Sequence, residues 1–318
     1  MIVVTLRGGL GNQMFQYAFG RGMAETSGRK LVLDLTMLPT GASPYLRAYA
    51  LDSMPLDGSL WKIGRLGKSA ATSRSRPQVA QLGRVARGRL QRWVVKEPKN
   101  DTLLRSADLP EHLAICVGYW QSPQYFEAIA DEIRRELTPK PTAKGRVSDI
   151  LRRTSGTHRI AVHVRRGDYV TDSSVRKVHG LQSADSVVDA VEGILEQVRG
   201  EASVIVLSED SGWCEQNLRF SARTIFAEAS GRLPAAEVLA LMSNCESHVI
   251  ANSSLSWWGA WLAGETAQHV LYPTHWFAQR SIRPEFRFPQ AWRAYGGEGG
   301  AADRNDAGKP VEKPIRDR

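Results

Sequence analysis

The chain has 318 residues, of which 42% are hydrophobic and 24% are charged, and it carries a net charge of +9. A chain of this length and composition can bury one large core or two ordinary ones, so we expect a folded, soluble protein of two domains. The longest stretch that leans apolar, Leu255–Ala263, is about half of the ~20 residues that a membrane-crossing helix needs.

The three cysteines, Cys116, Cys214 and Cys245, are far apart and form no CxxC pair. Their odd number and spacing argue against a zinc site and favour a reduced, cytoplasmic setting. Because Met1 leads directly into the strand-like run Ile2–Thr5, without a basic region or a cleavable apolar segment, we also expect no secretory signal.

Positive charge is concentrated in one segment, since residues 58–96 contain ten Lys or Arg and no Asp or Glu. Its glycines and serines predict a mobile or partly helical insert. A solvated, arginine-rich surface would explain the charge, and attraction to anionic lipid or nucleic acid is the alternative. The end of the chain, residues 296–318, consists largely of Gly, Pro and charged residues and predicts a disordered tail.

Strand-like and helix-like pieces alternate in two blocks, separated by a proline-punctuated linker around residues 138–145. In the first block we expect a strand over 1–6, a helix over 12–28 that ends at Gly28, and a strand over 30–35. In the second block we expect strands over 159–166, 203–210, 222–227, 248–254 and 269–273, and helices over 183–198, 234–243 and 255–265.

Most of these strands are β-branched runs with polar residues at their carboxyl ends, where open parallel sheets bind ligands. The pattern predicts an α/β protein of two Rossmann-like domains that face each other across a cleft. We expect the first domain to span residues 1–145, with the basic insert at 58–96, and the second to span residues 146–295.

The glycine-rich turn "LRGGLGNQ", residues 6–13, joins the first strand to the first helix. Backbone N–H groups at such a turn can hold an anion such as phosphate. The turn does not match the dinucleotide fingerprint, because Met14 stands at the third expected glycine, and no Walker lysine follows. A tight turn that needs positive φ angles is the structural alternative.

The strand "IAVHVRR" leads into a cluster of polar residues, His163, Arg165, Arg166 and Asp168. Two arginines at the end of a strand can clamp a diphosphate, although they could also form a structural ion pair with Asp168. The concentration of these side chains at one strand end, beside a glycine, favours the functional interpretation.

A third motif, "NSSLSWWGAW", places Asn252, Ser253 and Ser254 before a predicted helix. The first turn of that helix can bind a second face of a phosphate. Tryptophans at positions 257, 258 and 261 are more typical of core packing than of a platform that stacks on sugars.

The chain resembles the bacterial branch of the α-1,2-fucosyltransferase family over residues 8–277. The matching stretches, in the family's order, are "GGLGNQMFQYA", "VGYWQSPQYF", "HVRRGDY", "SEDSGWC", "LMSNCESHVIANSSLSWWGAWL" and "YPTHWF". The resemblance implies a GT-B-type enzyme that transfers L-fucose from GDP-β-L-fucose to a galactose hydroxyl of a glycan, with inversion and without a metal. It implies that the first domain is the acceptor side and that the second domain binds GDP-fucose. Such an enzyme would build O-antigen or exopolysaccharide on a lipid carrier, and the basic segment would then contact the inner face of the membrane. We expect no cofactor and no nucleic-acid partner.

By matching motif, the resemblance assigns the donor diphosphate to His163, Arg165 and Arg166, with Asn12 completing the clamp. We expect Arg166, or Arg165, to neutralise the β-phosphate as GDP departs. The absence of an Asp-x-Asp triplet agrees with a metal-free reaction. The other donor-binding candidates are Gly9, Gly11, Gln13, Ser208, Asp210, Asn252, Ser253 and Ser254.

The general base is left open. Asp168 is the carboxylate nearest the arginines in the sequence and is the catalytic candidate, but it could instead orient them. Asp172 is a weaker candidate, and Asp210 fits nucleotide recognition better. The sequence departs from the family after His179-Gly180, where a Tyr-Tyr pair is replaced, and this bears on the acceptor preference.

Two alternatives remain. One is a transferase that forms another linkage or uses another sugar nucleotide. The other is a non-catalytic protein that binds nucleic acid or lipid, which would leave the three strand-end motifs unexplained.

Overall fold

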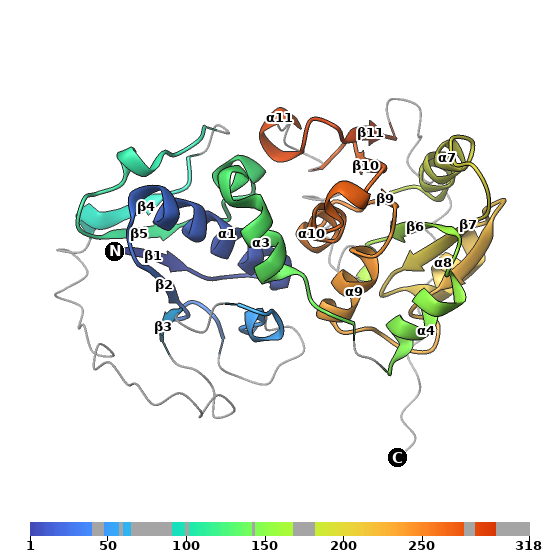
Figure 1. Ribbon diagram of the computed structural model, residues 1–318, viewed down its shortest axis with the longest axis horizontal. Coiled ribbons are helices and arrows are strands. Elements are labelled where there is room, and N and C mark those ends of the chain that lie inside the picture. Colours follow the sequence, from blue (N-terminus) through green and yellow to red (C-terminus); the bar gives the residue numbers. More distant parts are fainter. Residues whose placement is uncertain are drawn as a thin grey trace, which may run out of the picture.

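The computed structural model describes residues 1–39, 48–56, 60–64, 91–98, 102–141, 144–167, 182–276 and 284–296. These residues form two parallel β-sheets with helices packed around them, and the two halves lie side by side along the long axis (Figure 1). The predicted α/β architecture of two Rossmann-like domains is therefore confirmed.

The first sheet has five strands in the order β3-β2-β1-β5-β4, and every pairing is parallel. Its strands are β1 (Ile2–Thr5), β2 (Leu31–Asp34), β3 (Trp61–Ile63), β4 (Val94–Lys96) and β5 (Ala114–Val117). The central strand β1 is buried along its whole length, as its unbroken apolar run predicts. Helix α1 (Leu10–Ser27) ends as predicted at Gly28, whose φ of 63° is the left-handed cap that glycine adopts without strain.

Each end of the basic segment contains a strand that the sequence did not predict. Within the described part of residues 58–96, β3 and β4 belong to the first sheet, on its two opposite edges. These two strands were not predicted, because strands of three residues give too weak a pattern to recognise, whereas the 3-10 turn η2 (Gln91–Trp93) agrees with a partly helical segment. The remainder of the insert, and the tail beyond Gly296, lie outside the described residues.

The second sheet has six strands in the order β11-β10-β9-β6-β7-β8, again all parallel. Its strands are β6 (His158–His163), β7 (Ala202–Leu207), β8 (Arg223–Phe226), β9 (Ser247–Val249), β10 (His269–Pro273) and β11 (Arg293–Tyr295). All five strands and three helices predicted for this block are present, within a few residues of the predicted bounds.

The other α-helices are α3 (Ala130–Leu137), α4 (Arg146–Arg153), α7 (Ala184–Leu195), α8 (Ser211–Asn217), α9 (Ala235–Met242), α10 (Ser254–Leu262) and α11 (Pro284–Arg287). Single turns of 3-10 helix are η1 (Leu51–Ser53), η2 (Gln91–Trp93), η3 (Ser106–Asp108), η4 (Pro123–Tyr125), η5 (Glu127–Ile129) and η6 (Gly264–Thr266). No helix in the described part of the chain is long and apolar enough to cross a membrane.

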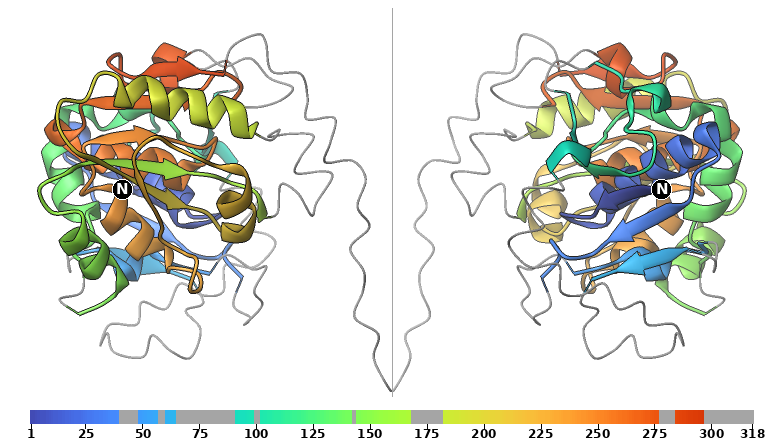
Figure 2. Two further views of the ribbon diagram at one scale, coloured as in Figure 1. Left: turned by 90° about the vertical axis from the view of Figure 1, so that its right-hand side faces the viewer. Right: turned by 90° about the vertical axis from the view of Figure 1, so that its left-hand side faces the viewer.

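Helices cover both faces of the second sheet (Figure 2). Ile160 and Val162 of β6 belong to the cluster packed under α7 and α8, whereas Ala161 between them faces the cluster under α4, α9 and α10. This alternation is the two-residue period of a strand, and burial on both faces explains the continuous apolar run of β6.

Helices α1 and α10 join the two halves. The ring of Phe15 lies 4.6 Å from that of Trp257 and 4.9 Å from that of Trp258, centroid to centroid. Trp257, Trp258 and Trp261 are buried in a cluster that continues from the first sheet into the second, so the prediction that they pack in the core is confirmed.

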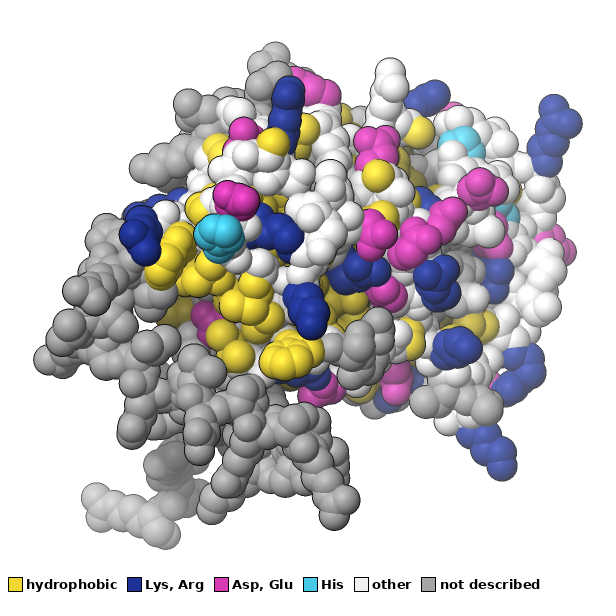
Figure 3. Space-filling model, turned by 60° about the vertical axis from the view of Figure 1, so that its left-hand side comes forward, with side chains coloured by type: hydrophobic (Ala, Val, Ile, Leu, Met, Phe, Trp, Pro, Cys, Tyr) yellow, Lys and Arg dark blue, Asp and Glu magenta, His cyan; other side chains and the backbone are white. Residues whose placement is uncertain are grey.

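The two halves differ in surface character. Figure 3 shows hydrophobic side chains exposed among Lys and Arg on the N-terminal half, whereas the visible surface of the C-terminal half is mainly charged or polar. Among the described residues, the exposed large hydrophobic side chains are Met1, Met37, Trp61, Leu103 and Tyr119.

Candidate functional site

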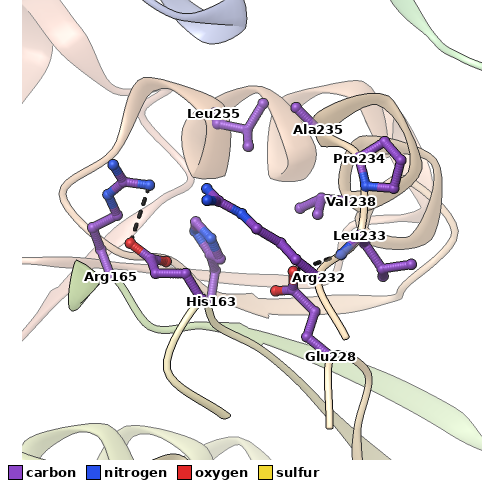
Figure 4. A pocket seen from close by; sticks show the side chains of 10 residues that line it. His163, Arg165, Glu228, Arg232, Leu233, Pro234, Ala235, Val238 and Leu255 are labelled. Atoms are coloured by element: carbon purple, nitrogen blue, oxygen red, sulfur yellow. Dashed lines mark hydrogen bonds and ion pairs between the residues drawn. The ribbon is translucent and has the colours of Figure 1, made fainter. Parts of the chain in front are cut away.

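A pocket of about 410 Å³ opens at the carboxyl ends of β6, β7 and β8, beside the first turn of α9 (Figure 4). Parallel α/β sheets bind ligands at this edge. The lining residues are His163, Arg165, Glu209, Glu228, Arg232, Leu233, Pro234, Ala235, Val238 and Leu255. Two of the three predicted diphosphate ligands, His163 and Arg165, therefore meet in one pocket.

The two adjacent arginines are placed differently. Arg165 lines the pocket and its Nη1 lies 3.2 Å from Oε1 of Glu209. Arg166 is not among the lining residues: its Nε lies 3.3 Å from Oδ2 of Asp210, and its guanidinium carbon lies 3.7 Å from the ring centroid of Trp213. Successive residues of an extended segment point to opposite sides, so only one of the pair faces the pocket.

His163, the last residue of β6, is buried, with 5% of its surface exposed. Burial, followed by the charges of Arg165 and Arg232, lowers the pKa of His163 to about 3. The imidazole is therefore neutral near neutral pH and offers one N–H donor and one acceptor nitrogen. Its Nδ1 is buried and has no hydrogen-bond partner among the described residues.

Two charged residues of the pocket, Glu228 and Arg232, were not found from the sequence. Oε1 of Glu228 accepts a hydrogen bond from the backbone N–H of Leu233 at 2.8 Å, and burial raises the pKa of this carboxyl. Arg232 extends across the pocket toward His163 (Figure 4). Glu228 closely follows β8, so the strand-end rule could have found it, whereas no motif marks Arg232.

The glycine-rich turn meets the second domain beside this pocket. A Cβ atom on Gly11 would lie 2.5 Å from the backbone nitrogen of Leu255 and 2.5 Å from the carbonyl carbon of Ser254. A side chain does not fit there, so Gly11 permits the close contact of α1 with α10. Because Leu255 lines the pocket, the turn lies directly behind one pocket wall.

The two amides of the turn have protein partners. Oδ1 of Asn12 accepts a hydrogen bond from Nε2 of Gln121 at 2.8 Å. Gln13 is fully buried, and its Nε2 donates to the carbonyl oxygens of Gly8 (2.9 Å) and Ala48 (2.8 Å). Since its Oε1 also accepts from a backbone N–H, of Ala50 at 3.0 Å, the amide of Gln13 serves the shape of the turn. Gly9 is the N-cap residue of α1.

The polar residues after β7 form local bonds. Oγ of Ser208 accepts from the backbone N–H of Asp210 at 3.1 Å, and Oδ1 of Asp210 accepts from that of Trp213 at 3.2 Å. Asp210 thus caps α8 and also holds Arg166.

Ser253 and Ser254, at the start of α10, lie at the junction of the domains. Ser253 is the N-cap residue of α10, without a side-chain capping bond, and Ser254 is the residue packed on Gly11. Asn252 is buried, with its Nδ2 3.5 Å from the carbonyl oxygen of Trp276. None of these three residues is among those that line the pocket.

The candidate bases Asp168 and Asp172 lie outside the described residues. In the described ranges, no group of three or more His, Cys, Asp or Glu side chains is placed to hold a metal ion.

A family model for glycosyl transferase family 11 matches residues 93–295. The chain is 29% identical over 299 residues to the alpha-1,2-colitosyltransferase of Escherichia coli, which covers 92% of this chain and 98% of that protein. It is 30% identical over 300 residues to the O-antigen biosynthesis glycosyltransferase WbnK of Escherichia coli, covering 86% of this chain and 94% of that protein. It is 26% identical over 297 residues to galactoside alpha-(1,2)-fucosyltransferase 1 of Ateles belzebuth, covering 90% of this chain and 72% of that protein. Because the family model covers more than half of the chain, the predicted resemblance is confirmed, and the chain belongs to glycosyl transferase family 11.

Proposed function

We propose that this glycosyltransferase transfers L-fucose from GDP-β-L-fucose to a galactose hydroxyl of a glycan and forms an α-1,2 linkage. A β-linked donor and an α-linked product require inversion at the anomeric carbon. The names of the relatives support the linkage, and the pocket supports a donor that carries a diphosphate.

One observation carries the proposal: His163, Arg165 and Arg232 converge on the pocket at the carboxyl ends of the strands. A guanidinium has five N–H donors, so Arg165 can hold Glu209 and a phosphate oxygen at the same time. The neutral imidazole of His163, which also lines the pocket, can add a hydrogen bond. We therefore assign the diphosphate to Arg165 and Arg232, with His163 between them.

The reaction we propose is a single displacement. The acceptor hydroxyl oxygen bonds to the anomeric carbon of fucose while the bond from that carbon to the β-phosphate oxygen breaks, and a carboxylate takes the hydroxyl proton. Arg165 and Arg232 stabilise the charge that develops on GDP, so the step needs no metal ion. Asp168 remains the proposed base. Arg166, which stacks on Trp213, is assigned to holding the loop that follows β6.

Colitose is a second candidate for the transferred sugar, because the colitosyltransferase covers 92% of this chain. Colitose differs from fucose in lacking the hydroxyl at C3. A site that hydrogen-bonds this hydroxyl would discriminate strongly between the two donors.

We further propose a cytoplasmic enzyme that contacts a membrane from its N-terminal half and acts on a lipid-linked acceptor. The basic composition of residues 58–96 and the exposed Trp61 at the edge of the first sheet support this proposal. Lysine, arginine and tryptophan favour the surface of an anionic bilayer.

The test is incubation of the protein with GDP-fucose or GDP-colitose and a panel of β-galactosides, with the linkage of each product determined by NMR. We expect an α-1,2-linked product from GDP-fucose. Transfer from GDP-colitose alone would identify colitose as the transferred sugar. A product with another linkage would overturn the proposed α-1,2 linkage. No transfer from either donor would overturn both the proposed donor and the proposed linkage.

A further inference from the structure

The loop after β5 holds an exposed aromatic side chain in a rigid frame. Tyr119 is 41% exposed, whereas its neighbour Trp120 is fully buried and stacks on Phe19 with ring centroids 4.0 Å apart. Trp120 has a φ of 56°, in the left-handed region that is strained for a non-glycine residue. Such strain persists only where the surrounding structure enforces it, and it is concentrated at binding and catalytic sites.

A carboxylate enforces this conformation. The two oxygens of Glu97 accept hydrogen bonds from the backbone N–H groups of Tyr119 at 2.7 Å and Trp120 at 2.8 Å. A Cβ atom on Gly118 would lie 2.5 Å from the Cβ of Glu97, so only glycine fits at position 118. The ring of Tyr119 is thereby held outward while the ring of Trp120 points into the core.

A buried amide ties this loop to the glycine-rich turn. Oε1 of Gln16 accepts from the backbone N–H of Arg7 at 3.0 Å, and its Nε2 donates to the carbonyl oxygen of Gly118 at 3.0 Å. The guanidinium carbon of Arg7 then lies 4.2 Å from the ring centroid of Tyr119 and covers one face of the ring. The pair is therefore built at the carboxyl ends of β1 and β5, the edge at which parallel sheets bind ligands.

We propose that Tyr119, supported by Arg7, is a platform on which a pyranose residue of the acceptor glycan stacks. The C–H-bearing face of a galactose ring is apolar and packs on an aromatic ring, and Arg7 holds the opposite face of the Tyr119 ring in place. A rigid ring with few rotatable bonds loses little entropy when it binds.

The platform is connected to a wall of the pocket through the glycine-rich turn. The chain runs from Arg7 through the turn to Gly11, which contacts the pocket-lining Leu255, and Gln121 of the Tyr119 loop bonds to Asn12 of the turn. The inference rests on the proposed transfer to a galactoside, since it assigns the acceptor side of that reaction to the first domain.

The experiment measures galactoside binding separately from turnover. Saturation-transfer NMR with methyl β-D-galactoside and a β-galactosyl disaccharide is compared for the parent, Tyr119→Ala and Tyr119→Phe. Trp61→Ala, which removes an exposed aromatic side chain from β3, is the matched control. We expect Tyr119→Ala to weaken the saturation transfer and to raise the KM for the acceptor about three- to tenfold. The affinity for GDP, measured by calorimetry, should not change. Tyr119→Phe, which keeps the ring, should behave as the parent does.

The platform is overturned if the parent binds neither galactoside, if Tyr119→Ala binds them as the parent does, or if Tyr119→Phe fails to restore binding. A fall in GDP affinity in Tyr119→Ala would also overturn it, because the ring would then act on the donor side. Galactoside binding that depends on Tyr119, without transfer from either donor, would retain the platform and overturn the proposed function.

Discussion

The indole N–H of Trp258 donates a hydrogen bond to the carbonyl oxygen of Gly11 at 3.0 Å and so joins α10 of the second domain to the first turn of α1. Both residues are buried, and Gly11 also packs on the backbone of Ser254 and Leu255. Since Leu255 lines the pocket, this contact couples the glycine-rich turn to the shape of the pocket that we propose for the donor.

Gly11→Ala should destabilise the protein, because the added methyl group would lie 2.5 Å from backbone atoms that cannot rotate away. We expect a loss of about 1–3 kcal/mol in the free energy of unfolding, as for overpacked cores, together with reduced transfer. Chemical denaturation measures the first effect. Gly193→Ala is the matched control, since a Cβ there meets nothing within 4 Å and alanine favours the interior of α7. A stability of Gly11→Ala equal to that of the parent would contradict the close contact.

The sequence predicts the fold where a strand or helix is strongly patterned. The apolar run of β6 and the Gly28 cap of α1 identify their elements because each depends on local chemistry. Strands β3 and β4, of three residues each, are stabilised by pairing with distant strands, and their own residues carry too little information.

The sequence likewise predicts some residues of the candidate site and misses others. His163 and Arg165 could be predicted because they lie at the end of a recognisable strand, but the sequence does not reveal which of two adjacent arginines faces the pocket. That choice depends on Asp210 and Trp213, which bind Arg166 from another strand end. Arg232 lies between β8 and α9, where no motif marks it, so its position in the pocket could not be predicted from local sequence.

Activity should survive excess EDTA, because the proposed charge stabilisation comes from guanidinium groups. The measurement is the initial rate of transfer from GDP-fucose with and without chelator. Loss of transfer in EDTA that is restored by magnesium or manganese would contradict the metal-free reaction.

Two substitutions distinguish the proposed base, Asp168, from Glu228, a carboxylate that lines the pocket. A general base contributes about 10²–10⁴-fold, so Asp168→Asn should lower kcat by at least about 10²-fold. The affinity for GDP should remain near that of the parent. Glu228→Gln keeps the acceptor oxygen for the Leu233 N–H and should retain kcat within about tenfold. If Glu228→Gln loses at least about 10²-fold in kcat while Asp168→Asn stays within about tenfold of the parent, the base is Glu228.

Acid should destabilise the protein through its buried histidines. Burial lowers the pKa of His248 to about 4 from its ordinary value of 6.5, with the charge of His158 acting in the same direction and that of Glu246 opposing it. The unfolded state then binds more protons between these values, so the free energy of unfolding is at its full value above pH 6.5 and falls toward pH 4.

His248→Gln should flatten this dependence in urea unfolding measured across that pH range, since glutamine does not titrate. His269→Gln, on the neighbouring strand β10 and less buried, is the control. An unchanged pH dependence in His248→Gln would show that other groups cause the acid sensitivity.

The last prediction separates the two adjacent arginines. Lysine keeps the positive charge but loses the planar fork that binds two oxygens at once. Because Arg165 lines the pocket and is proposed to bind the phosphate more strongly as GDP departs, Arg165→Lys should lower kcat more than it raises the KM for the donor. By comparison with the loss of one oxyanion donor, the fall should be about 10²-fold. Arg232→Lys should act in the same direction.

Arg166→Lys is the matched variant, since the same change is made one residue away from the pocket. Arg166 contacts Trp213 and Asp210, so this variant should lower stability while its kcat falls by less than about tenfold. Steady-state kinetics, calorimetric titration of GDP and urea unfolding of the three variants provide the comparison. If Arg166→Lys loses about 10²-fold in kcat while Arg165→Lys retains the parental value, the leaving-group charge is stabilised by Arg166. The loop after β6 must then rearrange when the donor binds, because Arg166 would have to leave Trp213 to reach the phosphate.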